Sequence, residues 1–215
     1  MRKAFLLSLC WAILPAVPAL IQNELIGSPY TDLYPSVWSL YAPWMSSKGF
    51  FYTTMLGYPE GMPLYSSALL KSFLALPLSL LLEPHHIYNF FILLSRFLGP
   101  FFAFFSARAW GYKETASLGF ALFFGAAPYF HGYAVEGIIE GVDAWPIALW
   151  LWSVASGKRL LMALSLALSV LCSWYLGASV CLLTLLFSIE KRDTLFSFFG
   201  LLLAAPFVYV FTQNF

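Results

Sequence analysis

The chain has 215 residues, of which 61% are hydrophobic and only 10% are charged. Water-soluble domains carry about 25% charged residues, so a soluble fold would leave too much apolar surface in contact with water. The formal net charge of +1 provides no electrostatic attraction for nucleic acid. Composition therefore predicts an integral membrane protein and excludes a nucleic-acid partner.

The apolar residues form continuous runs rather than an alternating pattern. A helix needs about 20 apolar residues to cross about 30 Å of hydrocarbon, and several runs approach that length. Continuous runs favour a helical bundle over a membrane barrel, whose strands alternate. Cys10, Cys172 and Cys181 all lie in such runs, which indicates small packed residues rather than disulfides or a metal site.

Residues 1–22 begin with Met-Arg-Lys and continue as an apolar run. The run is longer than the core of a usual signal peptide, and no small-x-small cleavage pattern precedes the polar region that follows. We therefore expect an uncleaved first transmembrane helix, with Arg2 and Lys3 in the cytoplasm.

A long polar stretch, residues 23–86, follows this helix. Its centre, Gly27 to Trp38, contains one carboxylate, Asp32, among aromatic residues and prolines. We expect it to face the outside of the membrane and to form half of an active site. Within it, residues 64–82 contain Lys71 and end in Glu-Pro-His-His, which predicts an interfacial helix with polar groups near the lipid headgroups.

The remaining apolar runs are residues 87–107, 116–130, 142–155, 160–176, 178–189 and 194–212. The basic residues form four clusters, which are Arg2/Lys3, Arg108/Lys113, Lys158/Arg159 and Lys191/Arg192. All four fall on the cytoplasmic side if the helix at 64–82 does not cross the membrane. The pattern thus predicts an all-α membrane domain with about seven transmembrane helices, a cytoplasmic N-terminus and some short spans in locally thin membrane.

The second predicted outer loop is rich in polar side chains: His131, Glu136, Glu140 and Asp143. Glu136 and Glu140 are four positions apart, so a helical turn would place them on one face, where they could share a proton or a cation. The alternative is a solvated turn between two helices.

Arg96 is the only charged residue within the run 87–107. An ionisable residue inside a membrane segment is a functional hypothesis by default, and arginine suits a phosphate or carboxylate partner. The alternative is a structural salt bridge to Asp32 or Glu140. His85 and His86 are further candidates for substrate binding. No Cys or His stands at metal-ligand spacing from them, which favours the alternative of an ordinary interfacial loop.

Several short motifs carry a family resemblance: Leu56-Gly-Tyr-Pro-Glu-Gly, Ile87-Tyr-Asn-Phe, Arg96-Phe-Leu-Gly, Ala107-Arg-Ala-Trp-Gly and Trp145-Pro-Ile-Ala-Leu. Together with the long acidic first outer loop, they resemble the GT-C membrane glycosyltransferases, and more closely the YfhO-like bacterial membrane proteins. These enzymes take a sugar from a polyprenyl-phosphate donor at the extracytoplasmic face. The resemblance implies an inner-membrane protein, truncated to the N-terminal module that family members share.

The resemblance also implies roles for the candidate residues. Asp32 matches the first-loop carboxylate that acts as catalytic base or helps to bind a divalent cation, Mg²⁺ or Mn²⁺. Glu136 or Glu140 would occupy the second-loop acidic position, with Glu140 as the metal ligand, and Arg96 would contact the donor phosphate. The chain departs from the Asp-x-Asp or Glu-x-Asp pattern of many members at the second loop.

Two other classes of protein remain open. A lipid or solute transporter component would need charges along a path through the bilayer, and only Arg96 lies at depth. A non-catalytic remnant or assembly subunit would fit the short length.

Overall fold

The computed structural model describes residues 1–30, 33–45, 52–53, 62–63, 68–139, 141–187 and 199–206. The predicted site residues Asp32 and Glu140 lie outside these ranges, as do Lys191 and Arg192. The described residues are helical apart from connections and one antiparallel pairing of two short strands, β1 (Tyr52–Thr53) and β2 (Met62–Pro63). The predicted all-α class is confirmed for this part of the chain.

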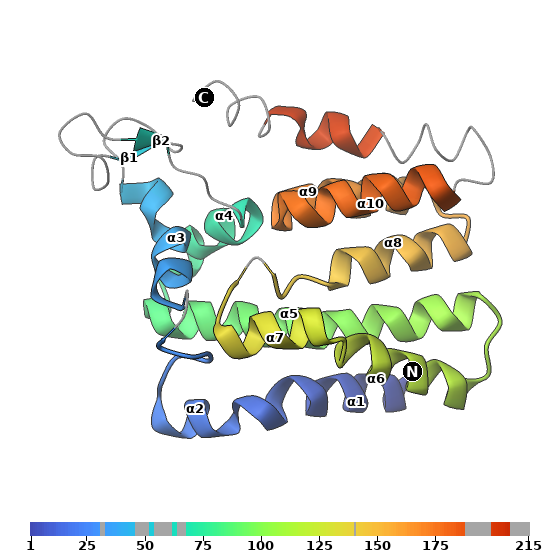
Figure 1. The fold of residues 1–215 in the computed structure, drawn as a ribbon, viewed down its shortest axis with the longest axis horizontal. Coiled ribbons are helices and arrows are strands. Elements are labelled where there is room, and N and C mark those ends of the chain that lie inside the picture. Colours follow the sequence, from blue (N-terminus) through green and yellow to red (C-terminus); the bar gives the residue numbers. More distant parts are fainter. Residues whose placement is uncertain are drawn as a thin grey trace.

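The helices lie side by side in layers (Figure 1). Their bounds are α1 (Arg2–Ile13), α2 (Val17–Gln22), α3 (Leu33–Met45), α4 (Leu69–Leu78), α5 (Pro84–Ala109), α6 (Glu114–Gly125), α7 (Pro128–Glu136), α8 (Trp145–Ala155), α9 (Arg159–Cys172) and α10 (Trp174–Phe187). Helix α5 is central, because α1, α6 and α8 all contact it, while α9 contacts α8 and α10 contacts α9. Helices α3 and α4 gather at one end of the layers (Figure 1).

The first membrane-length segment bends without breaking. A 3₁₀ turn, Leu14–Ala16, joins α1 to α2, and each of the two prolines, Pro15 and Pro18, stands in the first turn of the element that it enters. Proline has no backbone N–H to donate, so a tighter turn replaces the regular helical ladder there. The segment ends at Asn23, whose left-handed φ of 56° terminates α2.

Two helical segments, Arg2–Gln22 and Pro84–Ala109, are long and apolar enough to cross a membrane in the described part of the chain. A third is obtained if α6 and α7, which are bent by 47°, count as one broken span. Helices α8, α9 and α10 have 11, 14 and 14 residues. At about 1.5 Å per residue they measure roughly 16–21 Å, short of the 30 Å hydrocarbon layer.

The described basic clusters share one end of the molecule (Figure 1). The start of α1, the α5–α6 connection and the α8–α9 connection all lie there, and Lys3 Nζ is 3.4 Å from Glu114 Oε1 across two of them. The opposite end holds α3, α4 and the first turn of α5 (Figure 1). The molecule therefore has a basic end and an end built from the first loop.

The start of the first loop is tied to α5 by buried polar side chains. Asn89 accepts a hydrogen bond from Ile26 N at 2.9 Å and donates one to Glu24 O at 2.8 Å. Tyr88 donates to Gly137 O at 2.6 Å, and its hydroxyl also lies 3.2 Å from Ile26 O. These contacts anchor both predicted outer loops to the same stretch of α5, above a core that includes Leu33, Leu40, Ile92 and Ile139.

One prediction for the outer region is wrong, and another stays a prediction. The interfacial position of the segment at 64–82 is the one that stays a prediction; within it, Lys71 on α4 is only 4% exposed, because its ammonium pairs with the buried Asp143 carboxylate. The region 130–141 was expected to be a loop, but most of it belongs to α7. Helix α7 ends at Glu136 because Gly137 adopts a left-handed φ of 78°. Glu140 lies outside the described residues, so the expected helical face shared with Glu136 stays a prediction.

Candidate functional site

A buried ion pair joins α4 to the segment before α8. Lys71 Nζ lies 2.8 Å from Asp143 Oδ2, and the carboxylate is fully buried. Ser95 on α5 donates a hydrogen bond to Asp143 Oδ1 at 2.5 Å, and Lys71 Nζ donates to Ile139 O at 2.6 Å. The Lys71 ammonium on α4 therefore compensates the charge of Asp143, and the Ser95 hydroxyl on α5 bonds its second carboxylate oxygen.

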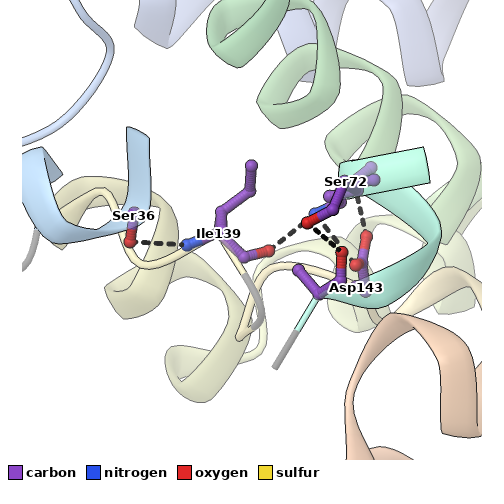
Figure 2. A network of polar contacts seen from close by, with 7 residues as sticks. Ser36, Ser72, Ile139 and Asp143 are labelled. Atoms are coloured by element: carbon purple, nitrogen blue, oxygen red, sulfur yellow. Dashed lines mark hydrogen bonds and ion pairs between the residues drawn. The ribbon is translucent and has the colours of Figure 1, made fainter. Parts of the chain in front are cut away.

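Further serines extend this network to α3 (Figure 2). Ser36 Oγ accepts a hydrogen bond from Ile139 N at 3.3 Å, and Ser72 Oγ lies 3.2 Å from Ser39 O. The network thus holds α3, α4 and α5 together with Ile139 and Asp143 from the connection before α8. Removing one partner of such a buried ion pair lowers the free energy of unfolding by several kcal/mol, because the other charge stays buried without compensation.

Arg96 follows Ser95 on α5 but faces α1 instead of α4. Its side chain is buried, at 8% exposure, and its guanidinium lies 5.8 Å from the centre of the Trp11 ring. Arg96 Nη2 contacts Trp11 O at 3.5 Å, the outer limit for a hydrogen bond. Arg96 Nε is buried and has no hydrogen-bond partner among the described residues. The arginine side chain therefore packs on an aromatic ring, and its Nε–H remains available as a hydrogen-bond donor.

A small cavity of about 20 Å³ lies beside Arg96, where α1, α5 and the break between α6 and α7 meet. Its lining includes Trp11, His131 and Gly125. The His131 ring lies 6.1 Å from the Trp11 ring, and His131 Nδ1 is buried without a partner in the described part of the chain. This volume is about that of one water molecule.

The electrostatics of the cavity favour an anion. Helix α7 begins at Pro128, and Phe130 and His131 from its first turn line the cavity. The positive end of the α7 dipole therefore acts on the same space as the Arg96 guanidinium. No carboxylate is among the described residues that line the cavity. Val142 and Ala144 contribute to its wall, but the side chain of Asp143 between them pairs with Lys71 instead.

The predicted histidines do not join this site. His85 and His86 lie in the first turn of α5, about 15 Å along the helix axis from Arg96. His85 Nε2 is 3.3 Å from Asn23 Oδ1 and His85 Nδ1 is 3.5 Å from Glu83 Oε2, so the ring is held at the rim of the molecule. Glu136 is exposed at the last residue of α7 and does not line the cavity.

The described residues do not fit a divalent cation. They contain no group of three or more His, Cys, Asp or Glu side chains that could hold one. Asp143 is the buried acid among them, and both of its oxygens are already engaged by Lys71 and Ser95. The predicted metal ligands Asp32 and Glu140 lie outside the described ranges, so that assignment stays a prediction.

Sequence reasoning identified Arg96 but missed its contact with Trp11 and, elsewhere on α5, the pairing of Lys71 with Asp143. Trp11 carries no charge and gives no signal in a long apolar run. Lys71 and Asp143 did carry one, because single charges of opposite sign in apolar surroundings are expected to pair. Their separation of 72 positions hid the pairing.

Comparisons with protein-family models, with characterised proteins and with solved structures found no match to this chain.

Proposed function

We propose that the chain is a multi-pass inner-membrane protein with about seven crossings and a cytoplasmic N-terminus. We propose further that it acts as a GT-C-like glycosyltransferase module, which transfers a sugar from a polyprenyl-phosphate donor at the extracytoplasmic face. The observation that carries this proposal is Arg96, a buried arginine on a membrane-length helix with unused donors and no described carboxylate partner.

The depth of Arg96 suits a lipid-linked phosphate. Helix α5 has 26 residues and measures about 39 Å, which exceeds the hydrocarbon thickness by about 9 Å. Its first residues pack against α3, α4 and the connection before α8. In the proposed orientation this end faces outside, and we assign the surplus length to it. Arg96 lies about 18 Å from the start of α5 and thus about 9 Å below the outer hydrocarbon boundary, a distance that a long side chain can partly span.

Donor binding requires the cavity to open. The present volume of about 20 Å³ holds a water molecule and is too small for a phosphate group. The break between α6 and α7 lines this cavity through Gly125 and His131. In the proposed cycle α7 swings away from α1 at this break, and the guanidinium exchanges the Trp11 carbonyl for two phosphate oxygens.

The proposed chemistry needs one base and one phosphate-binding cation. The Asp32 carboxylate takes the proton of the acceptor hydroxyl while the acceptor oxygen attacks the anomeric carbon of the sugar. The bond between that carbon and the phosphate oxygen breaks, and polyprenyl phosphate leaves with the bonding electrons. The Arg96 guanidinium stabilises the negative charge that develops on the leaving phosphate.

Transfer of a labelled sugar from polyprenyl phosphate in proteoliposomes tests this function. Asp32→Asn is expected to lower the transfer rate by about 10²–10⁴-fold, the usual contribution of a general base. Glu114→Gln is the matched control, because Glu114 pairs with Lys3 at the basic end and should retain the wild-type rate. Equal rates for wild type and Asp32→Asn would remove Asp32 from the mechanism. Absence of transfer by the wild-type protein would contradict the transferase assignment.

The break between α6 and α7 favours a second candidate, a lipid or solute transporter component. Interrupted membrane helices in transporters direct half-helix N-termini at anionic substrates, and α7 begins beside Arg96 in this way. Proteoliposomes separate the two candidates, since a transporter moves labelled lipid or solute across the bilayer without forming a glycosidic bond.

A further inference from the structure

A second and much larger cavity lies near the basic end of the molecule. Its volume is about 740 Å³, and it is bounded by α5, α6, α8 and α10. Its walls are mainly apolar, with Phe120, Leu151, Val154 and Leu186 among the lining residues. Sites for small molecules usually measure about 300–1,000 Å³ and are lined in this way. The cavity therefore has the size and lining for an apolar chain.

The rim of this cavity is aromatic and basic. Trp110 and Tyr112, both exposed, stand on the α5–α6 connection and line the opening. Arg108 Nη1 donates a hydrogen bond to the backbone oxygen of Tyr112 at 2.6 Å, which holds the exposed guanidinium beside a residue that lines the cavity. Lys113 follows Tyr112 directly and is also exposed. An anionic headgroup placed here would meet two cations beside an apolar interior.

The wall also offers a polar atom without a partner. Trp150 lines the cavity and is 1% exposed, and its indole Nε1 has no hydrogen-bond partner within the described ranges. A buried N–H without an acceptor is unfavourable. The ester carbonyl of a glycerolipid supplies an acceptor at the junction between headgroup and acyl chain.

We propose that this cavity binds an anionic phospholipid of the cytoplasmic leaflet. One acyl chain fills the apolar volume, and the phosphate lies between Arg108 and Lys113. Positive charge on the cytoplasmic side of a membrane protein attracts anionic lipid in this leaflet. The site is independent of the Arg96 cavity, because Arg108 lies about 18 Å further along α5, at its other end.

Native mass spectrometry of the protein, delipidated and then given equal amounts of phosphatidylglycerol and phosphatidylcholine, tests this proposal. The wild-type protein is expected to retain one phosphatidylglycerol in preference to phosphatidylcholine, by about fivefold for each basic residue at the rim. Arg108→Gln should lower that preference about fivefold, while Arg2→Gln, another exposed arginine at the basic end, should leave it unchanged. Val154→Phe narrows the cavity and should reduce retention of both lipids.

Several results would overturn the proposal. These are equal retention of the two lipids by the wild-type protein, an unchanged preference in Arg108→Gln, and full retention in Val154→Phe. Because Arg108 is exposed, its variant is expected to fold, and a thermal transition equal to that of wild type verifies this. Arg96→Met should retain phosphatidylglycerol normally, so failure of this site and failure of the proposed transferase are distinguishable.

Discussion

Two single charges in apolar surroundings, Lys71 and Asp143, hold together the end of the molecule opposite the basic clusters. The sequence placed Lys71 at the headgroups and Asp143 in an acidic loop, because each residue by itself suits water. The structure buries both, since the ammonium and the carboxylate neutralise each other, Ser95 donates to the second carboxylate oxygen, and Lys71 also donates to Ile139 O. Lys71 and Asp143 are 72 positions apart in the sequence, and they meet only because of how α4 packs on α5. Local sequence patterns do not specify this packing.

Removal of one charge from this pair should therefore be more harmful than removal of both. Lys71→Met or Asp143→Leu is expected to lower the free energy of unfolding by about 3–5 kcal/mol, because the other charge stays buried and unpaired. The double variant should recover most of that loss. Denaturant unfolding in detergent micelles measures all three variants and gives the coupling between the two sites.

The exposed pair Lys3 and Glu114 is the matched control. Its side chains are 74% and 50% exposed, so Lys3→Met should change the free energy of unfolding by less than about 1 kcal/mol. Single variants of Lys71 and Asp143 that resemble this control would show that the buried pair is not structurally important.

Arg96 was the most predictable residue of the candidate site. A single charge within an apolar run is visible in the sequence, and the structure places this residue beside a cavity. Its neighbours were less predictable, because Trp11 and His131 come from α1 and α7 and meet Arg96 only when three helices pack. The acidic partners Asp32 and Glu140 remain predictions from the sequence.

At the scale of elements, hydrophobic runs located the long helices but not their interruptions. The run 87–107 falls within α5, and the runs 142–155 and 160–176 overlap α8 and α9. The run 116–130 is divided between α6 and α7, because Pro128 cannot donate to the preceding turn and instead begins a new helix. Hydrophobicity alone does not show such a break, whereas the proline does.

Gly137 fixes the end of α7 and its contact with α5. A Cβ at this position would lie 2.7 Å from Leu33 Cδ1 and 2.9 Å from the Tyr88 hydroxyl oxygen, and the φ of +78° disfavours side chains. Gly137→Ala is therefore expected to lower the free energy of unfolding by about 1–3 kcal/mol.

Gly132 in the same helix provides the control for this prediction. A Cβ there meets nothing within 4 Å, so Gly132→Ala should be neutral or slightly stabilising. Thermal unfolding of the two variants side by side measures the difference. A Gly137→Ala variant with the same thermal unfolding transition as wild type would mean that α7 does not end at a left-handed Gly137.

At the scale of the whole molecule, the described basic clusters gather at one end and the first loop at the other (Figure 1). The number of crossings does not follow from helix length alone, since two or three described segments meet the usual criteria and α8, α9 and α10 are short. The orientation therefore depends on the charge distribution.

Cysteine labelling from one side of the membrane tests this orientation. In a background without Cys10, Cys172 and Cys181, His86→Cys at the start of α5 should react with an impermeant maleimide from outside. Thr115→Cys, exposed at the start of α6, should react only after permeabilisation. The reverse labelling pattern would invert the proposed topology, and labelling of both positions from outside would contradict α5 as a crossing.

Equilibrium binding of radiolabelled polyprenyl phosphate tests whether Arg96 binds the phosphate of a lipid-linked donor. Arg96→Met is expected to weaken binding by about 10–100-fold, the loss expected for charge-assisted hydrogen bonds, whereas Arg96→Lys should retain part of the affinity. Arg2→Gln, exposed at the start of α1, should bind as wild type does. Equal affinities of wild type and a folded Arg96→Met variant would show that Arg96 does not bind this phosphate.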